Sequence, residues 1–239
     1  MNKDPLKPLR SRGPDWLPWN RSRGQRILLQ SRELLYERVF SNALPRFQIE
    51  DRYFPLRSAA NYSLLYLILR VVTELPVRRV LELGCGQTTL LLDDLMRCRA
   101  LDITTLEHDP VWATRIQGRV THRVSQAALV ERTVHGMACP AYDVAPGDVR
   151  GPIDLMIVDG PPGSARRSRW VTLEYVDALL QRDFVIIFDD AQRKGEQETI
   201  AAVLDFLNAR GVDFACGVTR ALRTQFLVAA GSFREAAYY

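Results

Sequence analysis

Residues 80–88 read Val-Leu-Glu-Leu-Gly-Cys-Gly-Gln-Thr, a short apolar run followed by two glycines and then by a helix-like segment. Gly84 and Gly86 allow the backbone to turn sharply and to approach a ligand closely, with the N–H groups of a helix start directed at it. A lone pair of glycines can equally form a tight turn without a ligand. We interpret the stretch as the first strand, turn and helix of an α/β sheet.

Further short apolar runs follow this stretch and are separated by helix-like segments. They are rich in Val, Ile and Leu and do not alternate strictly, which is typical of strands buried on both faces of a parallel sheet. Alternating strands and helices of this kind predict a doubly wound sheet. The predicted strands are 80–83, 103–106, 133–137, 153–158 and 184–188.

The end of the chain breaks this alternation. The strand-like runs 212–216 and 225–230 have no helix between them, which predicts an antiparallel C-terminal hairpin. The expected fold is therefore α/β, with a doubly wound, seven-stranded, mostly parallel sheet and helices on both faces. We expect residues 1–57 to form an N-terminal arm and helical extension, which could act as a lid, and residues 58–239 to form the α/β domain.

Composition limits the function classes. The chain has 239 residues, of which 47% are hydrophobic and 25% charged, enough apolar material for one core. Its net charge is +4, but residues 1–32 alone carry +6, so that the rest of the chain carries −2. A body without a basic excess argues against a nucleic-acid partner. We interpret the basic tail as a solvated extension, with contact to an anionic surface as the alternative.

Cysteine spacing and hydropathy indicate a cytoplasmic protein. Cys85, Cys98, Cys139 and Cys216 are scattered, which suggests neither a zinc site nor a disulfide framework. The N-terminus lacks the apolar segment of a secretory signal. The most apolar stretch, 62–72, is too short to span a bilayer, which needs about 20 residues. The sequence does not indicate an oligomeric state.

Polar residues and glycines gather after the predicted strands, at the sheet edge where open α/β sheets bind ligands. Glu107 follows Gly86 by 21 residues. A carboxylate at about this separation can accept both ribose hydroxyls of an adenosine, and a helix N-terminal charge is the alternative. The gathered residues, in strand order, are Glu82, Gly84, Cys85, Gly86 and Thr88; Glu107, His108 and Asp109; His135, Gly136 and Met137; Asp159 and Gly160; and Asp189 and Asp190.

Several of these segments resemble motifs of the class I, S-adenosylmethionine (SAM)-dependent methyltransferases. Residues 80–86 resemble the first motif, in which an acidic residue leads into a glycine turn. Residues 103–109 resemble the acidic second motif, residues 153–160 the fourth, and residues 184–190 the fifth strand. The closing hairpin resembles the reversed last strand of the family. The resemblance covers about residues 58–230.

The resemblance implies a Rossmann-like methyltransferase domain and in-line transfer of a methyl group from SAM, with a hydroxyl of a small molecule or saccharide favoured as acceptor. It implies that Gly84 and Gly86 line the methionine end of SAM, that Glu82 approaches the amino group, and that Glu107 holds the ribose. Thr88 stands where many members have a third glycine. The remaining implied cofactor contacts are Cys85, Thr88, His108, Gly136, Met137 and Asp159.

Asp159, Asp189 and Asp190 are expected to converge at adjacent strand ends. Three carboxylates suit a hard divalent cation. The trio resembles that of the metal-dependent O-methyltransferases of the catechol and macrolide-sugar types, which implies a Mg²⁺ that activates a substrate hydroxyl. Alternatively, Asp189 and Asp190 only cap a helix and bind loop amides. Asp159 or His135 then acts as the general base.

The segment Asp159-Gly-Pro-Pro-Gly, followed by Arg166, Arg167 and Arg169, resembles the plant glucuronoxylan methyltransferases. This resemblance implies a saccharide or acidic substrate, and a solvated surface loop is the alternative. Three other functions stay open. A nicotinamide-dependent dehydrogenase would need glycine at Thr89. An aminopropyltransferase shares the fold, and a degenerate, non-catalytic scaffold would not need Glu107 or Asp159.

Overall fold

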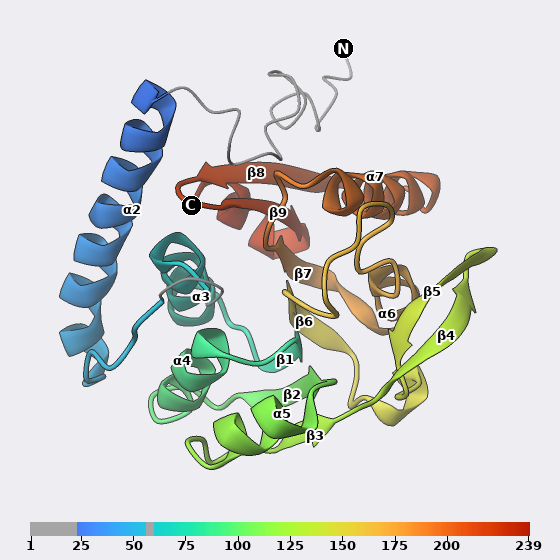
Figure 1. Cartoon of the computed structure of the whole chain (residues 1–239), viewed down its shortest axis with the longest axis horizontal. Helices are drawn as coiled ribbons and strands as arrows, with labels where there is room; N and C mark the ends of the chain where they lie inside the picture. Colours follow the sequence, from blue (N-terminus) through green and yellow to red (C-terminus); the bar gives the residue numbers. More distant parts are fainter. Residues whose placement is uncertain (1–22, 56–59) are drawn as a thin grey trace.

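The structure, a computed structural model, describes residues 23–55 and 60–239 (Figure 1). Residues 1–22, the first part of the arm and helical extension predicted for residues 1–57, lie outside the described residues, and the predicted lid is not tested. The predicted helical extension is present as α2 (Arg23–Ala43), which continues into a 3₁₀ turn, η2 (Leu44–Phe47).

A seven-stranded sheet with the order β3-β2-β1-β6-β7-β9-β8 forms the centre of the molecule. The neighbouring strands β3, β2, β1, β6 and β7 pair in parallel. Strand β9 runs antiparallel to both β7 and β8. This confirms the predicted mostly parallel sheet with a reversed C-terminal hairpin. The strands are β1 (Arg79–Leu83), β2 (Asp102–Glu107), β3 (Val124–Gln126), β6 (Ile153–Val158), β7 (Leu180–Phe188), β8 (Phe214–Arg220) and β9 (Thr224–Ala230).

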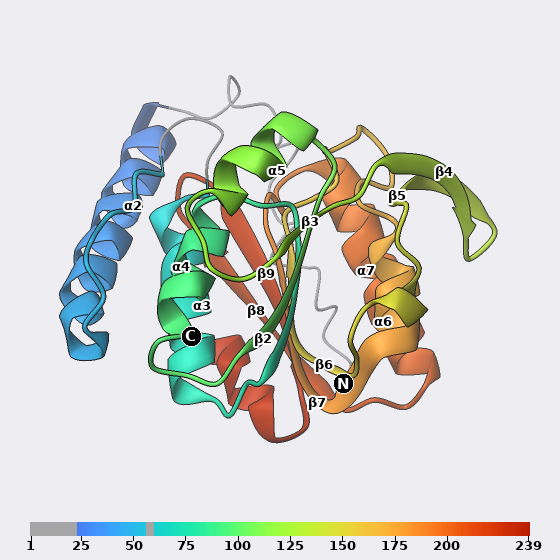
Figure 2. The same ribbon diagram turned by 90° about the horizontal axis from the view of Figure 1, so that it is seen from below.

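Helices cover both faces of the sheet, as predicted (Figures 1 and 2). One face packs against α3 (Tyr62–Glu74) and α4 (Gln87–Leu95), and the other against α6 (Thr172–Leu179) and α7 (Lys194–Ala209). Helix α5 (Pro110–Gln117) lies beside β3. Two short 3₁₀ segments, η3 (Pro146–Asp148) and η4 (Gly231–Tyr238), lie outside these helices.

Strand β6 shows why the sheet strands are continuously apolar. All six of its residues are buried. Leu155 and Ile157 belong to the core under α3 and α4, whereas Met156 and Val158 belong to the core under α6 and α7. Because successive side chains of a strand point to opposite faces, a sheet covered on both sides needs apolar residues at every position.

The described part of the N-terminal extension packs onto the α/β domain. Phe40, Leu44, Ile49 and Tyr53 are buried in the same core as α3 and α4. Helix α2 lies alongside α3 at the margin of the molecule (Figure 1). Among residues 23–55 and 60–239, no helix is both long and apolar enough to cross a membrane.

The prediction of a third sheet strand at 133–137 is wrong. This segment contains the turn of a separate two-stranded hairpin, formed by β4 (Leu129–Val134) and β5 (Met137–Tyr142), and the third sheet strand is β3. His135 and Gly136 have φ values of 47° and 75°. Positive φ at both central residues is the mark of a type I′ hairpin turn, which glycine adopts without strain.

Gly136→Ala is expected to destabilise the protein by about 1 kcal/mol, because a residue with a Cβ is strained at positive φ. An added Cβ would meet no atom within 4 Å, so the effect isolates backbone strain. In a chain of this size the melting temperature should fall by about 2–4 °C, measured by calorimetry. Gly147→Ala, which has equal space but no positive φ, is the matched control and should melt like the wild type. Equal shifts in both variants would contradict the turn assignment.

Candidate functional site

The ends of β1 and β6 are in direct backbone contact. Gly84 follows β1 with a φ of 87°, and a Cβ at this position would lie 3.0 Å from the backbone of Asp159 and Gly160. The amide of Asp159 donates to the carbonyl of Leu83 at 2.9 Å. Only glycine therefore fits at position 84, and Asp159 is held beside the turn that follows β1.

The next glycine opens onto free space. Gly86 precedes the first residue of α4, and an added Cβ there would meet no atom within 4 Å. Glycine has no side chain that could cap the first amides of the helix, and the N-terminus of a helix carries a partial positive charge. The turn thus presents an open, N–H-rich surface that suits the carboxylate of an amino-acid ligand.

Glu107, at the end of β2, faces this turn. Its side chain is buried, and its two oxygens accept hydrogen bonds from the amides of Cys85 and Asp109, each at 2.9 Å. His108 Nδ1 lies 2.8 Å from Oε1 of the same carboxylate. Trp112 adds a contact that the sequence analysis missed, because its Nε1 donates to the carbonyl of Cys85 at 2.7 Å.

Glu82 lies beneath the turn and is fully buried. Its carboxylate accepts hydrogen bonds from the hydroxyls of Thr88, Thr89 and Thr105. Burial removes water from the charged form and raises the pKa of Glu82 to about 7. The three threonines thus attach the start of α4 and the middle of β2 to β1.

Asp159 occupies the strand end next to the open turn. Its Oδ1 accepts from Arg169 Nη2 at 3.1 Å, and 23% of its side chain is exposed. Its Oδ2 has no hydrogen-bond partner within the part of the chain that the structure describes. Burial and the neighbouring Asp189 raise the pKa of Asp159, and Arg169 opposes them. This carboxylate can therefore take up a proton near neutral pH.

Comparisons with known proteins agree with this geometry. Residues 81–191 match the family model of a methyltransferase domain. The O-methyltransferase TomG from Streptomyces achromogenes, solved in complex with SAM, is similar over 87% of this chain and 99% of its own, with a TM-score of 0.55 and 16% identity. The corresponding values for the O-methyltransferase from Bacillus cereus, solved with S-adenosylhomocysteine (SAH), are 84%, 91%, 0.48 and 17%. No curated protein matches the chain in sequence.

The matched segment begins in β1 and ends just after β7, so it includes Gly84, Glu107 and Asp159. The mostly parallel, seven-stranded sheet and the reversed last strand are those expected from the sequence. A methyltransferase domain of the class I, SAM-dependent type therefore covers residues 81–191 of the chain. The family resemblance is thus confirmed.

The structure of this methyltransferase brings most of the predicted cofactor residues together. The residues around the turn after β1 and the end of β2 form one contiguous group: Glu82, Gly84, Cys85, Gly86, Thr88, Glu107 and His108. The Glu82 carboxylate accepts hydrogen bonds from three threonine hydroxyls beneath the turn. The resemblance had implied that Glu82 approaches the amino group of SAM. Whether each residue contacts the cofactor stays a prediction.

His135, Gly136 and Met137 do not join this group. They lie at the turn of the β4–β5 hairpin, which projects beside α6 and α7, away from the turn after β1 (Figure 1). His135 Nε2 is 3.9 Å from Asp177, and its ring packs edge-on against Phe206. These residues were expected near the cofactor because the third sheet strand was wrongly predicted at 133–137. The segment after β3 takes this place instead, where the amide of Ala127 donates to the carbonyl of Glu107 at 2.8 Å.

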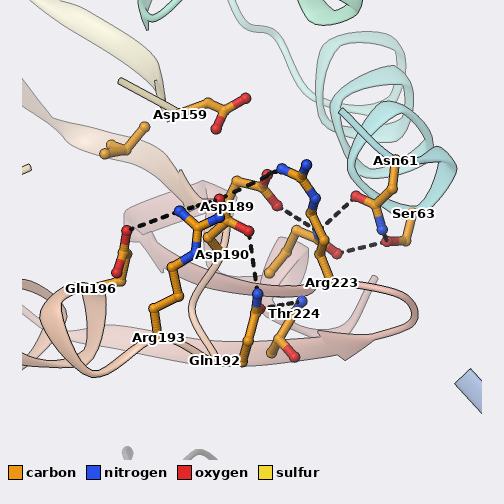
Figure 3. Close-up of polar contacts among 12 residues, drawn as sticks. Asn61, Ser63, Asp159, Asp189, Asp190, Gln192, Arg193, Glu196, Arg223 and Thr224 are labelled. Atoms are coloured by element: carbon orange, nitrogen blue, oxygen red, sulfur yellow. Dashed lines mark hydrogen bonds and ion pairs between the residues drawn. The ribbon is translucent and has the colours of Figure 1, made fainter. Parts of the chain in front are cut away.

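The three predicted metal ligands do converge. One oxygen from each of Asp159, Asp189 and Asp190 lies within 4.8 Å of the others. Guanidinium groups of Arg169, Arg193 and Arg223 contact the same carboxylates, and Figure 3 shows Arg193 and Arg223 beside Asp189 and Asp190. The residues present therefore do not fit a divalent cation without displacing arginine.

Only one of the three arginines after Asp159 reaches the site. Arg169 is buried and contacts Asp159, whereas Arg166 and Arg167 are exposed. Arg166 pairs with Glu198 on α7, and the amide of Arg167 donates to the same carboxylate. The sequence pattern indicated arginines near the strand end but not which of them turns inward.

The raised pKa of Glu82 predicts a pH-dependent stability. An acid whose pKa is higher in the folded protein stabilises it below the usual pKa of 4.5, and this stabilisation is lost as the pH rises through about 7. Glu82→Gln removes the titration. The free energy of unfolding of the variant should fall less between pH 5 and pH 8, by up to about 3 kcal/mol, in urea titrations.

The control for this experiment is Glu131→Gln, because Glu131 is exposed on β4. Its stability should follow the wild-type pH dependence. If the Glu82→Gln curve runs parallel to the wild-type curve, the titration of Glu82 does not affect stability and the assignment is wrong.

Proposed function

We propose that this methyltransferase transfers the methyl group of SAM to a hydroxyl oxygen of a small molecule or saccharide, with Asp159 as the general base. The proposal is carried by Asp159 Oδ2, which has no hydrogen-bond partner among the described residues. It belongs to a carboxylate of raised pKa beside the open glycine turn. TomG is itself an O-methyltransferase, but at 16% identity its likeness concerns the fold. The oxygen acceptor therefore rests on Asp159.

The turn after β1 and the end of β2 provide the groups that would hold SAM. The open space at Gly86 and the helix start suit the amino-acid end, and the Glu107 carboxylate suits the ribose hydroxyls. When bound, SAM supplies a methyl group activated by the sulfonium, which becomes bonded to the acceptor oxygen and leaves SAH. The buried Glu82, on β1, attaches the start of α4 and the middle of β2 through hydrogen bonds from Thr88 and Thr105.

Asp159 supplies the proton transfer. A hydroxyl is a poor nucleophile until it loses its proton, and a base works best when its pKa lies near the operating pH. The hydrogen bond from Arg169 to Oδ1 helps to fix the orientation of the carboxylate. The proton of the acceptor hydroxyl moves to Oδ2, and rate enhancement rests otherwise on alignment of the reactants.

The loop after Asp159 adds no support for an acceptor that carries an anionic group. Arg166 and Arg167 are exposed on this loop but do not reach the site, and the Arg166 guanidinium already pairs with Glu198. The choice among hydroxylated acceptors is therefore left to a direct test of acceptors.

Cofactor binding tests the first half of the proposal. Glu107→Ala should weaken SAH binding about 10- to 100-fold, because hydrogen bonds to a charged acceptor contribute about 1.5–3 kcal/mol. Titration calorimetry of folded wild type and variant measures this, and Glu131→Ala on the exposed face of β4 is the matched control. If well-folded wild-type protein binds neither SAM nor SAH, the chain is a non-catalytic scaffold and the proposal fails.

Asp159→Asn tests the second half. A panel of hydroxylated acceptors that includes catechols, sugars and uronic acids identifies a substrate by transfer of a labelled methyl group from SAM. With that substrate, the variant should lose about 10²- to 10⁴-fold in kcat while SAH affinity is retained. Asp143→Asn, an exposed aspartate, should keep full activity. Undiminished kcat in Asp159→Asn would exclude Asp159 as the base.

A further inference from the structure

We infer that resident guanidinium groups take the place of a divalent cation among Asp159, Asp189 and Asp190. If the proposed methyl transfer is correct, it then proceeds without Mg²⁺. The inference rests on which protein donors contact each carboxylate oxygen.

Arg169 lies in a bridging position between two of the carboxylates. Its Nη2 is 3.1 Å from Asp159 Oδ1 and 3.5 Å from Asp190 Oδ2. Its other nitrogens donate to the carbonyls of Val158, Asp189 and Pro161 at 3.1–3.2 Å. All three nitrogens of this buried guanidinium therefore have partners, and the group cannot move away without breaking several hydrogen bonds.

The backbone of Arg169 supports the same conclusion. Its φ of 58° lies in the left-handed region, which long side chains rarely adopt. Strained backbone persists where surrounding contacts over-determine it. Here those contacts are the carboxylates and carbonyls around the guanidinium, so the strain indicates that the charge is held at this position.

Arg223, just before β9, bridges the second pair of carboxylates. Its Nη1 is 3.1 Å from Asp189 Oδ2 and 3.5 Å from Asp190 Oδ2. Arg193 Nη1 also contacts Asp190 Oδ2, at 2.9 Å (Figure 3). Three guanidinium groups thus face the three aspartates, and Arg193 also contacts the buried Glu196.

The remaining oxygens of Asp189 and Asp190 also have protein donors. Gln225 Nε2 donates to Asp189 Oδ1 at 2.7 Å, and Gln192 Nε2 donates to Asp190 Oδ1 at 3.2 Å. Mg²⁺ requires near-octahedral oxygen ligands at about 2.0–2.1 Å. To bind it, the cluster would have to lose these donors and leave a buried guanidinium without its partner, which is strongly unfavourable.

The test is a titration of the protein, free of SAM, with Mn²⁺, which prefers the same oxygen ligands as Mg²⁺ and is counted by electron paramagnetic resonance. The wild type should leave the Mn²⁺ signal as it is in buffer. Arg223→Met removes one charge from the cluster and should bind Mn²⁺ at least about tenfold more tightly than the wild type, because affinity follows ligand charge.

Two variants serve as controls. Arg223→Lys keeps the positive charge and should not gain Mn²⁺ binding. Arg210→Met removes an exposed arginine that pairs with Asp177, outside the cluster, and should behave like the wild type. Circular dichroism melting verifies that each variant is folded before titration.

Either of two results would overturn the inference. The first is Mn²⁺ binding by the wild type that Asp189→Asn abolishes, because the carboxylates then bind metal despite the arginines. The second is folded Arg223→Met that binds no more Mn²⁺ than the wild type. Neither measurement involves SAM, so failure here and failure of the proposed methyl transfer, tested by SAH calorimetry, are distinguishable.

Discussion

The close approach of the backbones of Gly84 and Asp159 is the constraint on which the rest of the site depends. A Cβ at position 84 would lie 3.0 Å from the Asp159 backbone, so the ends of β1 and β6 meet only because glycine stands there. This contact places the open start of α4 next to a carboxylate. Glu107 then completes the edge by bonding to the amide of Cys85. Candidate ligand-binding groups at the ends of three strands are thereby held together by backbone contacts.

Buried charge is the second organising feature. Glu82, Asp159 and Asp189 all have raised pKa values, chiefly because burial removes water from the carboxylates. Different neighbouring groups stabilise the charged forms of these carboxylates. Threonine hydroxyls surround Glu82, whereas guanidinium groups face the aspartates. Of these three carboxylates, only Asp159 keeps an oxygen without a hydrogen-bond partner among the described residues, and its backbone lies against the turn at Gly84.

The aspartate cluster connects the site to the N-terminal helices. Gln225, which donates to Asp189, also donates to Asn61 at 2.9 Å and accepts from Ser63 at 2.7 Å. Asn61 in turn donates to Glu33 on α2 at 2.9 Å. A continuous hydrogen-bond chain therefore runs from the strand end to α2. This network, with the shared core, explains why the described part of the extension packs as part of the methyltransferase domain.

The sequence by itself determined the α/β class, the reversed last strand and the glycine turn. It also determined the position of Glu107 at the end of the second strand and the convergence of Asp159 with Asp189 and Asp190. These features follow from local patterns, because buried parallel strands are apolar throughout and their ends share one edge. The position of the third strand was decided by tertiary structure, since the apolar segment 133–137 fits a strand and a hairpin turn alike. The inward turn of Arg169 and the approach of Arg223 were also decided there. Pairing between charges 10 to 34 residues apart in the sequence leaves no periodic signal, so only the folded chain shows what the carboxylates bind.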